Sequence, residues 1–155
     1  MFACGFDDNT IKLYDVQNYD KGPFATFNIQ ARGAPHTEWS TLTFSPCGNF
    51  ILGGTLDGAL FLVDAFDGRV LQHYGGTQKS STRMPIEATF TPDAQFVLSG
   101  SEEGVVYAWE AQAGGAPTVL AAHNSPVSCV KWNPKKMMMA SACCSLAFWL
   151  PSKLK

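Results

Sequence analysis

Residues 90–110 read FTPDAQFVLSGSEEGVVYAWE, and the rest of the chain can be organised around this stretch. The Thr-Pro-Asp step at 91–93 predicts a turn, because proline fixes its own φ and aspartate hydrogen-bonds its own backbone. The run 96–100 is a short β-branched and aromatic segment of strand length. Glu-Glu-Gly at 102–104 predicts a second, tight turn, and residues 105–109 a second strand. The resulting hairpin would be only marginally stable alone, so other segments must cover its faces.

Imperfect copies of this stretch recur along the chain. The small residue that ends each first strand aligns at positions 5, 54, 100 and 140, so the spacings are 49, 46 and 40 residues. The units 5–15, 54–64, 100–110 and 140–150 align without gaps, and the fourth is the weakest copy. An alternating strand and an aromatic–polar–proline step precede the last three units, and apolar runs at 24–27, 70–74 and 118–120 follow the first three. One unit therefore has four strands, here termed a, b, c and d.

Composition limits the classes of function. A length of 155 residues indicates one domain, and an apolar share of 46% is enough for a core. The net charge of −2 provides no strong electrostatic footprint for nucleic acid or an anionic membrane. The five cysteines are odd in number and lack C-x-x-C spacing, which favours reduced thiols in an intracellular protein. No zinc-ligand spacing or phosphate-binding loop is present, so we expect no metal or cofactor.

Four strands per unit of about 40–45 residues, ending near a Trp-Asp pair, are the signature of a β-propeller blade. The chain resembles WD40-repeat proteins: Trp109-Glu110, Tyr14-Asp15 and Val63-Asp64 stand where Trp-Asp falls, and Ala122-His123 where Gly-His falls. The resemblance implies an all-β fold, a β-propeller of four-stranded WD-repeat blades. We expect about three and a half blades of a seven-bladed ring, with blade portions at about 1–30, 38–75, 85–121 and 126–151.

The ends of the chain fall inside blades. The first segment reads as a b strand with no a strand before it, and the last as a c strand with no d strand after it. An open arc of blades would leave an apolar edge facing water. We therefore expect the C-terminal portion of a longer propeller whose N-terminal half is missing, since the resemblance implies that the N-terminus donates the last d strand. The alternative is a truncated fragment without independent function.

A narrower resemblance rests on five stretches: DKGPFATF at 20–27, DAFDG at 64–68, IEATFTPD at 86–93, ASAC at 140–143 and AFWLP at 147–151. They are similar to the WD-repeat subunit shared by the COMPASS histone lysine methyltransferase complex and nuclear type-1 protein phosphatase complexes, which has a yeast relative in the cleavage-and-polyadenylation factor. This implies a non-catalytic scaffold in chromatin regulation or transcription termination, nuclear rather than cytoplasmic. Its partners would be protein subunits, with no direct nucleic acid or membrane contact. A propeller-type hydrolase is the alternative class.

The candidate residues divide into repeat positions and loop residues. The repeat positions are Asp15, Asp57, Asp64, Glu103, Trp109, His123, Ser141 and Trp149. Two carboxylates can serve acid–base catalysis, but Asp57 and Glu103 recur at one turn position and are explained as turn residues. The possible partner contacts are Arg32, His36, Lys79 and Arg83, on the long d–a loops, with ordinary loop charge as the alternative.

The resemblance implies that His123 begins a hydrogen-bond network with Ser141 and Trp149, with an ordinary surface histidine as the alternative. The turn that should supply an aspartate reads Cys143-Cys144-Ser145 instead. Adjacent strand residues point to opposite faces, so we expect the two cysteines to be small buried residues and not a shared metal or redox site. No motif supports a Cys-His nucleophile, although the sequence leaves that pair open.

Overall fold

The computed structural model describes residues 1–29, 37–75, 81–121 and 123–151, which form four antiparallel sheets in chain order. The first sheet holds β1 (Phe2–Phe6), β2 (Thr10–Tyr14) and β3 (Ala25–Asn28). The second holds β4 (Trp39–Phe44), β5 (Phe50–Thr55), β6 (Leu60–Asp64) and β7 (Val70–Tyr74). The third holds β8 (Ala88–Phe90), β9 (Phe96–Ser99), β10 (Val105–Glu110) and β11 (Gly114–Ala121), and the fourth β12 (Cys129–Trp132), β13 (Met139–Ala142) and β14 (Leu146–Trp149).

Each sheet is a simple meander in which consecutive strands pair. The predicted hairpin is confirmed: β9 and β10 are antiparallel, with Val97 opposite Trp109 and Ser99 opposite Tyr107. The d strand of the same sheet is longer than the predicted 118–120, because the pairing of β11 with β10 continues across a bulge to Gly114. The described residues contain one helical turn, the 3₁₀ segment η1 (Tyr19–Lys21), and none of their helices has the length or apolar character to cross a membrane.

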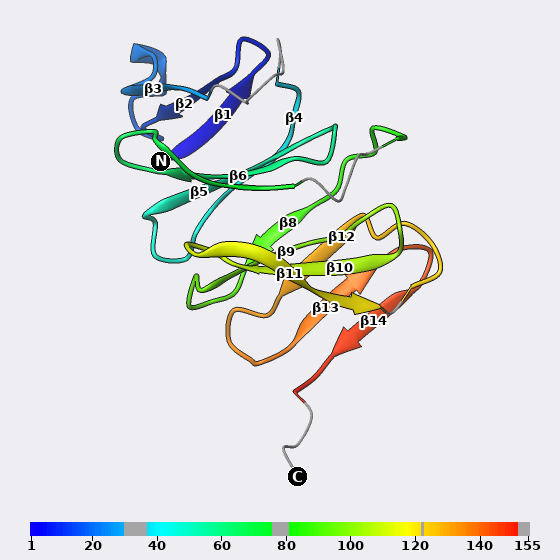
Figure 1. Cartoon of the computed structure of the whole chain (residues 1–155). Coiled ribbons are helices and arrows are strands. Elements are labelled where there is room, and N and C mark those ends of the chain that lie inside the picture. The colour runs from blue at the N-terminus through cyan, green and yellow to red at the C-terminus, as the bar shows by residue number, and fades with distance from the viewer. Residues whose placement is uncertain (30–36, 76–80, 122, 152–155) are drawn as a thin grey trace.

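The four sheets follow one another through space as they do along the chain (Figure 1). The a strands β4, β8 and β12 contact one another in sequence, and the b strand β1 contacts β4. The outer strands β7 and β11 are also in contact. This arrangement of small antiparallel sheets around their inner strands is that of propeller blades, so the predicted all-β class is confirmed.

The apolar core lies between the sheets as three separate layers. Successive side chains on a strand point to opposite faces, so each central strand contributes to two layers. On β5, Ile51 packs toward the first sheet and Leu52 toward the third. On β9, Val97 packs toward the second sheet and Leu98 toward the fourth. The sheets therefore hold one another in place through these layers, and their loops are supported by a fixed frame.

Two glycines mark where backbone segments of neighbouring sheets come close. A Cβ at Gly100 would lie 2.0 Å from the carbonyl oxygen of Val127, just before β12. Gly104 has φ +82, and a Cβ there would lie 2.6 Å from the carbonyl oxygen of His123. Only glycine fits this left-handed turn beneath the loop that carries His123. The third and fourth sheets are thus joined by backbone contact as well as by side chains.

Candidate functional site

The carboxylates at the repeat positions are engaged in local turns. Asp57 accepts a hydrogen bond from the Thr55 hydroxyl, and Glu103 accepts one from the Tyr107 hydroxyl at 2.9 Å. Asp15 accepts hydrogen bonds from the backbone N–H of Gln17 and the side-chain amide of Asn18, which lower its pKa, with the Asn18 contribution the larger. Asp64 Oδ1 accepts hydrogen bonds from the backbone N–H groups of Phe66 and Asp67. These contacts close and cap turns, as side chains of this type commonly do.

Trp109 has a packing role. It is 4% exposed and lies in the layer between the second and third sheets. Its ring stacks on Tyr107 with centroids 5.7 Å apart and lies 5.6 Å from that of Tyr74. The Tyr74 hydroxyl donates to the carbonyl oxygen of Ala111, and burial raises the pKa of Tyr74 well above its usual value. This tryptophan therefore anchors one sheet to the next.

The fourth sheet contains a side-chain network. The Trp149 indole N–H donates to Ser141 Oγ at 2.8 Å, and Ser141 Oγ lies 2.8 Å from His123 Nε2. His123 Nδ1 faces Cys143 Sγ at 3.1 Å and Ser145 Oγ at 3.5 Å. The structure thus brings together His123, Ser141 and Trp149. It adds Cys143 to this network, at the turn position where the repeat pattern would place an aspartate. Ser141 is 1% exposed, so its hydroxyl is a buried link between the loop and the strand.

The two neighbouring cysteines differ from our expectation of small buried residues. Strand β13 ends at Ala142, so Cys143 and Cys144 lie in the turn before β14, where side chains do not alternate between sheet faces. Cys143 is partly buried and Cys144 is exposed, and their sulfur atoms are 3.8 Å apart. The prediction of two small buried residues was wrong, because both cysteines lie in the turn, where Cys143 is only partly covered and Cys144 is exposed.

The loop residues proposed as partner contacts are only partly visible. Arg32, His36 and Lys79 lie outside the described residues. Arg83 forms an ion pair with Glu38 and is exposed on the surface. Beside it, the carboxylate of Glu102 accepts hydrogen bonds from the backbone N–H and hydroxyl groups of Ser81 and Thr82. This b–c turn therefore fixes one end of the d–a loop that carries Arg83.

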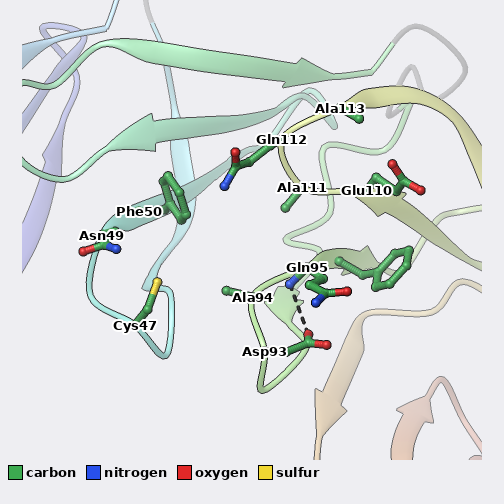
Figure 2. A pocket seen from close by; sticks show the side chains of 11 residues that line it. Cys47, Asn49, Phe50, Asp93, Ala94, Gln95, Glu110, Ala111, Gln112 and Ala113 are labelled. Atoms are coloured by element: carbon green, nitrogen blue, oxygen red, sulfur yellow. Dashed lines mark hydrogen bonds between the residues drawn. The ribbon is translucent and has the colours of Figure 1, made fainter.

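A groove lies at the other end of the sheets. It has a volume of about 510 Å³ and is surrounded by the a–b turns of the second and third sheets and the c–d turn of the third (Figure 2). Cys47 and Asn49 come from the first turn, Asp93 and Gln95 from the second, and Gln112 from the third. Sequence analysis did not select these residues. The available signal was the matched aromatic–polar–proline steps at 44–46 and 90–92, which place two polar turns at equivalent positions.

Local hydrogen bonds lower the pKa of two groups in this groove. The Thr91 hydroxyl lowers the pKa of Asp93, and the Ser45 hydroxyl lowers that of the Cys47 thiol. In the part of the chain that the structure describes, His, Cys, Asp and Glu side chains form no group of three or more suited to a metal ion. The groove is open, and its lining combines polar side chains such as Asn49 and Gln95 with apolar ones such as Phe50 and Phe96.

Comparison with known sequences agrees with this architecture. Residues 116–149, from β11 through β14, match the WD domain, G-beta repeat family. This segment is a WD40 repeat. The resemblance of the chain to WD40-repeat proteins is therefore confirmed. The match covers one strand of the third sheet and all three strands of the fourth, including the network of His123, Ser141 and Trp149.

Curated relatives are similar to the chain along almost its whole length. WD repeat-containing protein 82 of Drosophila melanogaster is 46% identical over 98% of the chain and 47% of its own length. Anthesis promoting factor 1 of Arabidopsis thaliana is 36% identical over 98% of the chain and 44% of its own length. COMPASS component SWD2 of Saccharomyces cerevisiae is 30% identical over 92% of the chain and 46% of its own length. The chain thus spans about half the length of these relatives.

Proposed function

We propose that this protein is a non-catalytic interaction scaffold, a regulatory subunit of a COMPASS-type histone lysine methyltransferase complex. The observation that carries the proposal is the similarity to COMPASS component SWD2, which extends over 92% of the chain. WD repeat-containing protein 82 supports a WD-repeat role at higher identity. The proposal places the protein in the nucleus, with protein subunits as its partners.

The scaffold role fits the way the sheets present their loops. Propeller-type domains bind partners through the loops at either end of their sheets, which a rigid core positions. At one end, Glu102 holds Ser81 and Thr82, and Arg83 pairs with Glu38 on the surface. The repeat carboxylates serve turns, so we assign them no part in acid–base chemistry. Function on this proposal is recognition, with Arg32, His36, Lys79 and Arg83 as contact residues.

The proposal extends to type-1 protein phosphatase complexes and transcription termination, because the stretches at 20–27 and 147–151 resemble the subunit that those complexes share. Within them, Phe27 packs in the core and Trp149 donates to Ser141, whereas Asp20 and Pro151 lie outside the strands.

Affinity capture from nuclear extract with the tagged chain tests the proposal. We expect histone lysine methyltransferase subunits, and methyltransferase activity on histone substrate, in the bound fraction. Phosphatase subunits in the same fraction would support the wider role. Recovery of neither set by a chain that unfolds cooperatively would refute the scaffold proposal.

A matched pair of variants tests the proposed surface. Arg83→Glu reverses a charge on the d–a loop, and Arg69→Glu reverses one on the c–d loop at the other end of the second sheet. Both arginines are exposed and belong to surface ion pairs, which contribute only about 0–1 kcal/mol each, so both variants should fold. We expect Arg83→Glu to reduce capture and Arg69→Glu to leave it unchanged. Equal capture by both variants would contradict the assignment of this loop.

A further inference from the structure

Cys143 occupies a position that carries an acid in the other three repeat units. Counting three residues on from Gly5, Gly54 and Gly100 gives Asp8, Asp57 and Glu103. The same count from Ala140 gives Cys143. The first three residues are hydrogen-bond acceptors in the structure, with Thr10, Thr55 and Tyr107 as their donors. In the fourth unit a thiol therefore stands where the repeat uses an anion.

The sulfur is surrounded by groups that favour an anion. The backbone N–H of Ser145 donates to Cys143 Sγ at 3.3 Å, and the Ser145 hydroxyl lies 3.4 Å from the same atom. His123 Nδ1 lies 3.1 Å away on another side. The described titratable groups that face this sulfur are His123, from the loop before β12, and Cys144, from the same turn. None of these contacts comes from a carboxylate.

The hydrogen bonds beyond His123 have a direction. An indole N–H is only a donor, so Trp149 donates and Ser141 Oγ accepts. The Ser141 hydroxyl hydrogen is then free to point to His123 Nε2. That arrangement places the imidazole hydrogen on Nδ1, directed at Cys143 Sγ. The chain of donors from Trp149 through Ser141 and His123 thus ends on a sulfur that accepts best as a thiolate.

Ionisation supports the same picture. Hydrogen bonds from the Ser145 hydroxyl and backbone N–H, with smaller contributions from Cys144 and His123, lower the pKa of Cys143 from 9.0 to about 6. In contrast, burial raises the pKa of Cys129. Reactive cysteines in proteins have this combination of lowered pKa, a histidine neighbour and partial exposure.

We propose that Cys143 is a thiol-modification site that forms mixed disulfides with low-molecular-weight disulfides. The Cys143 thiolate attacks one sulfur of the disulfide R–S–S–R. A new S–S bond forms to Cys143 as the original S–S bond breaks, and R–S⁻ leaves with the electron pair and takes a proton from water. Cys143 is oxidised and the departing sulfur is reduced, so the exchange needs no other oxidant.

The product is a mixed disulfide and not a bond between the two neighbouring cysteines. Adjacent Cα atoms are about 3.8 Å apart, whereas disulfides usually need about 4.4 Å or more. Modification removes the thiolate that His123 Nδ1 faces and adds bulk beside Ser145. It therefore weakens the network that joins the loop to β13 and β14, and couples the redox state of the thiol to the fourth sheet.

The experiment exposes the full chain to oxidised glutathione at pH 6 and follows each cysteine by peptide mass spectrometry. With a pKa of about 6, about half of Cys143 is thiolate there. An ordinary thiol of pKa about 8.5 is about 0.3% thiolate, a difference of about 160-fold. The lower intrinsic nucleophilicity of a low-pKa thiolate removes a factor of about 10–18, which leaves Cys143 about tenfold faster. Cys144, exposed in the same turn, is the internal comparison.

Two further measurements separate this proposal from simple exposure. Alkylation of Cys143 by iodoacetamide should be half-maximal near pH 6, and Ser145→Ala should move that midpoint upward because it removes the largest cause of the low pKa. The mixed disulfide should lower the thermal midpoint of unfolding, and reduction should restore it. Equal rates for Cys143 and Cys144, or an alkylation midpoint near pH 8.5 unaffected by Ser145→Ala, would overturn the proposal.

Discussion

The Ser141→Ala substitution tests how much the network of the fourth sheet stabilises the chain. It removes a hydroxyl that is 1% exposed and that lies 2.8 Å from both Trp149 Nε1 and His123 Nε2. Leaving a buried donor or acceptor unpaired costs about 1–3 kcal/mol, and because both partners are half-buried, water can replace part of each bond. We therefore expect a loss of about 2 kcal/mol in the free energy of unfolding.

Thermal unfolding followed by circular dichroism measures this loss. For a domain of this size, 1 kcal/mol corresponds to about 2–4 °C in the midpoint, so the expected decrease is about 4–8 °C. A double-mutant cycle with Trp149→Phe, which keeps an aromatic ring but lacks the N–H donor, isolates the bond between the two side chains. We expect a coupling energy of about 1 kcal/mol.

Two results would refute this reasoning. A decrease of less than about 1 °C for Ser141→Ala would mean that the hydroxyl makes no net contribution to stability. A coupling energy within about 0.3 kcal/mol of zero would mean that the hydrogen bond between the indole N–H and Ser141 does not stabilise the fold. Normal unfolding cooperativity in both single variants is the control for misfolding.

Three further predictions concern the core, the contact between sheets and the titrating thiol. Leu62→Ala should lower the unfolding free energy by about 2–5 kcal/mol in urea titrations, because Leu62 is 0% exposed. Leu146→Ala, at a residue that is 61% exposed, should change it little. Equal effects of the two substitutions would contradict the placement of the core. Gly100→Ala should lower the unfolding free energy by about 1–3 kcal/mol or more in the same titrations, since the new Cβ would lie 2.0 Å from the Val127 carbonyl oxygen. A variant as stable as the wild type would show that the two backbones are not in contact. Because folding lowers the pKa of Cys143 from 9.0 to about 6, ionisation of this thiol stabilises the fold most above pH 9.0, and that stabilisation is lost as the pH falls through about 6. Cys143→Asp should move this loss toward pH 4, the usual range of a carboxyl group, and an unchanged profile of thermal midpoint against pH would argue against a thiolate.

The fold could be predicted because every unit repeats the same signals. The pairing of Val97 with Trp109 follows from the two strands and the tight turn in residues 90–110. The d strand was underestimated because Gly114 and Pro117 read as loop residues, although a bulge lets β11 pair with β10 as far as Glu110. Tertiary pairing here overrides local propensity, as it commonly does for strands.

The candidate site was harder to predict, because it depends on where strands stop and which loops meet. The sequence places Cys143 in a turn, but the 3.1 Å contact of its sulfur with His123 Nδ1 depends on how the loop before β12 meets that turn. The groove at Cys47 and Asp93 joins turns from different units, so no single stretch of sequence describes it. Local patterns specify elements well, whereas contacts between distant loops depend on the assembled sheets.

The three core layers have different compositions. The layer between the first and second sheets includes Ile51 and Phe61, the next contains Tyr107 and Trp109, and the layer before the fourth sheet includes Met139. Each central sheet therefore has two faces of different shape, and each face is complementary to one neighbour. The shapes of these faces therefore specify the order of the sheets. A sheet placed beside the wrong neighbour would leave cavities and steric clashes between their side chains, even though its own backbone pairing was intact.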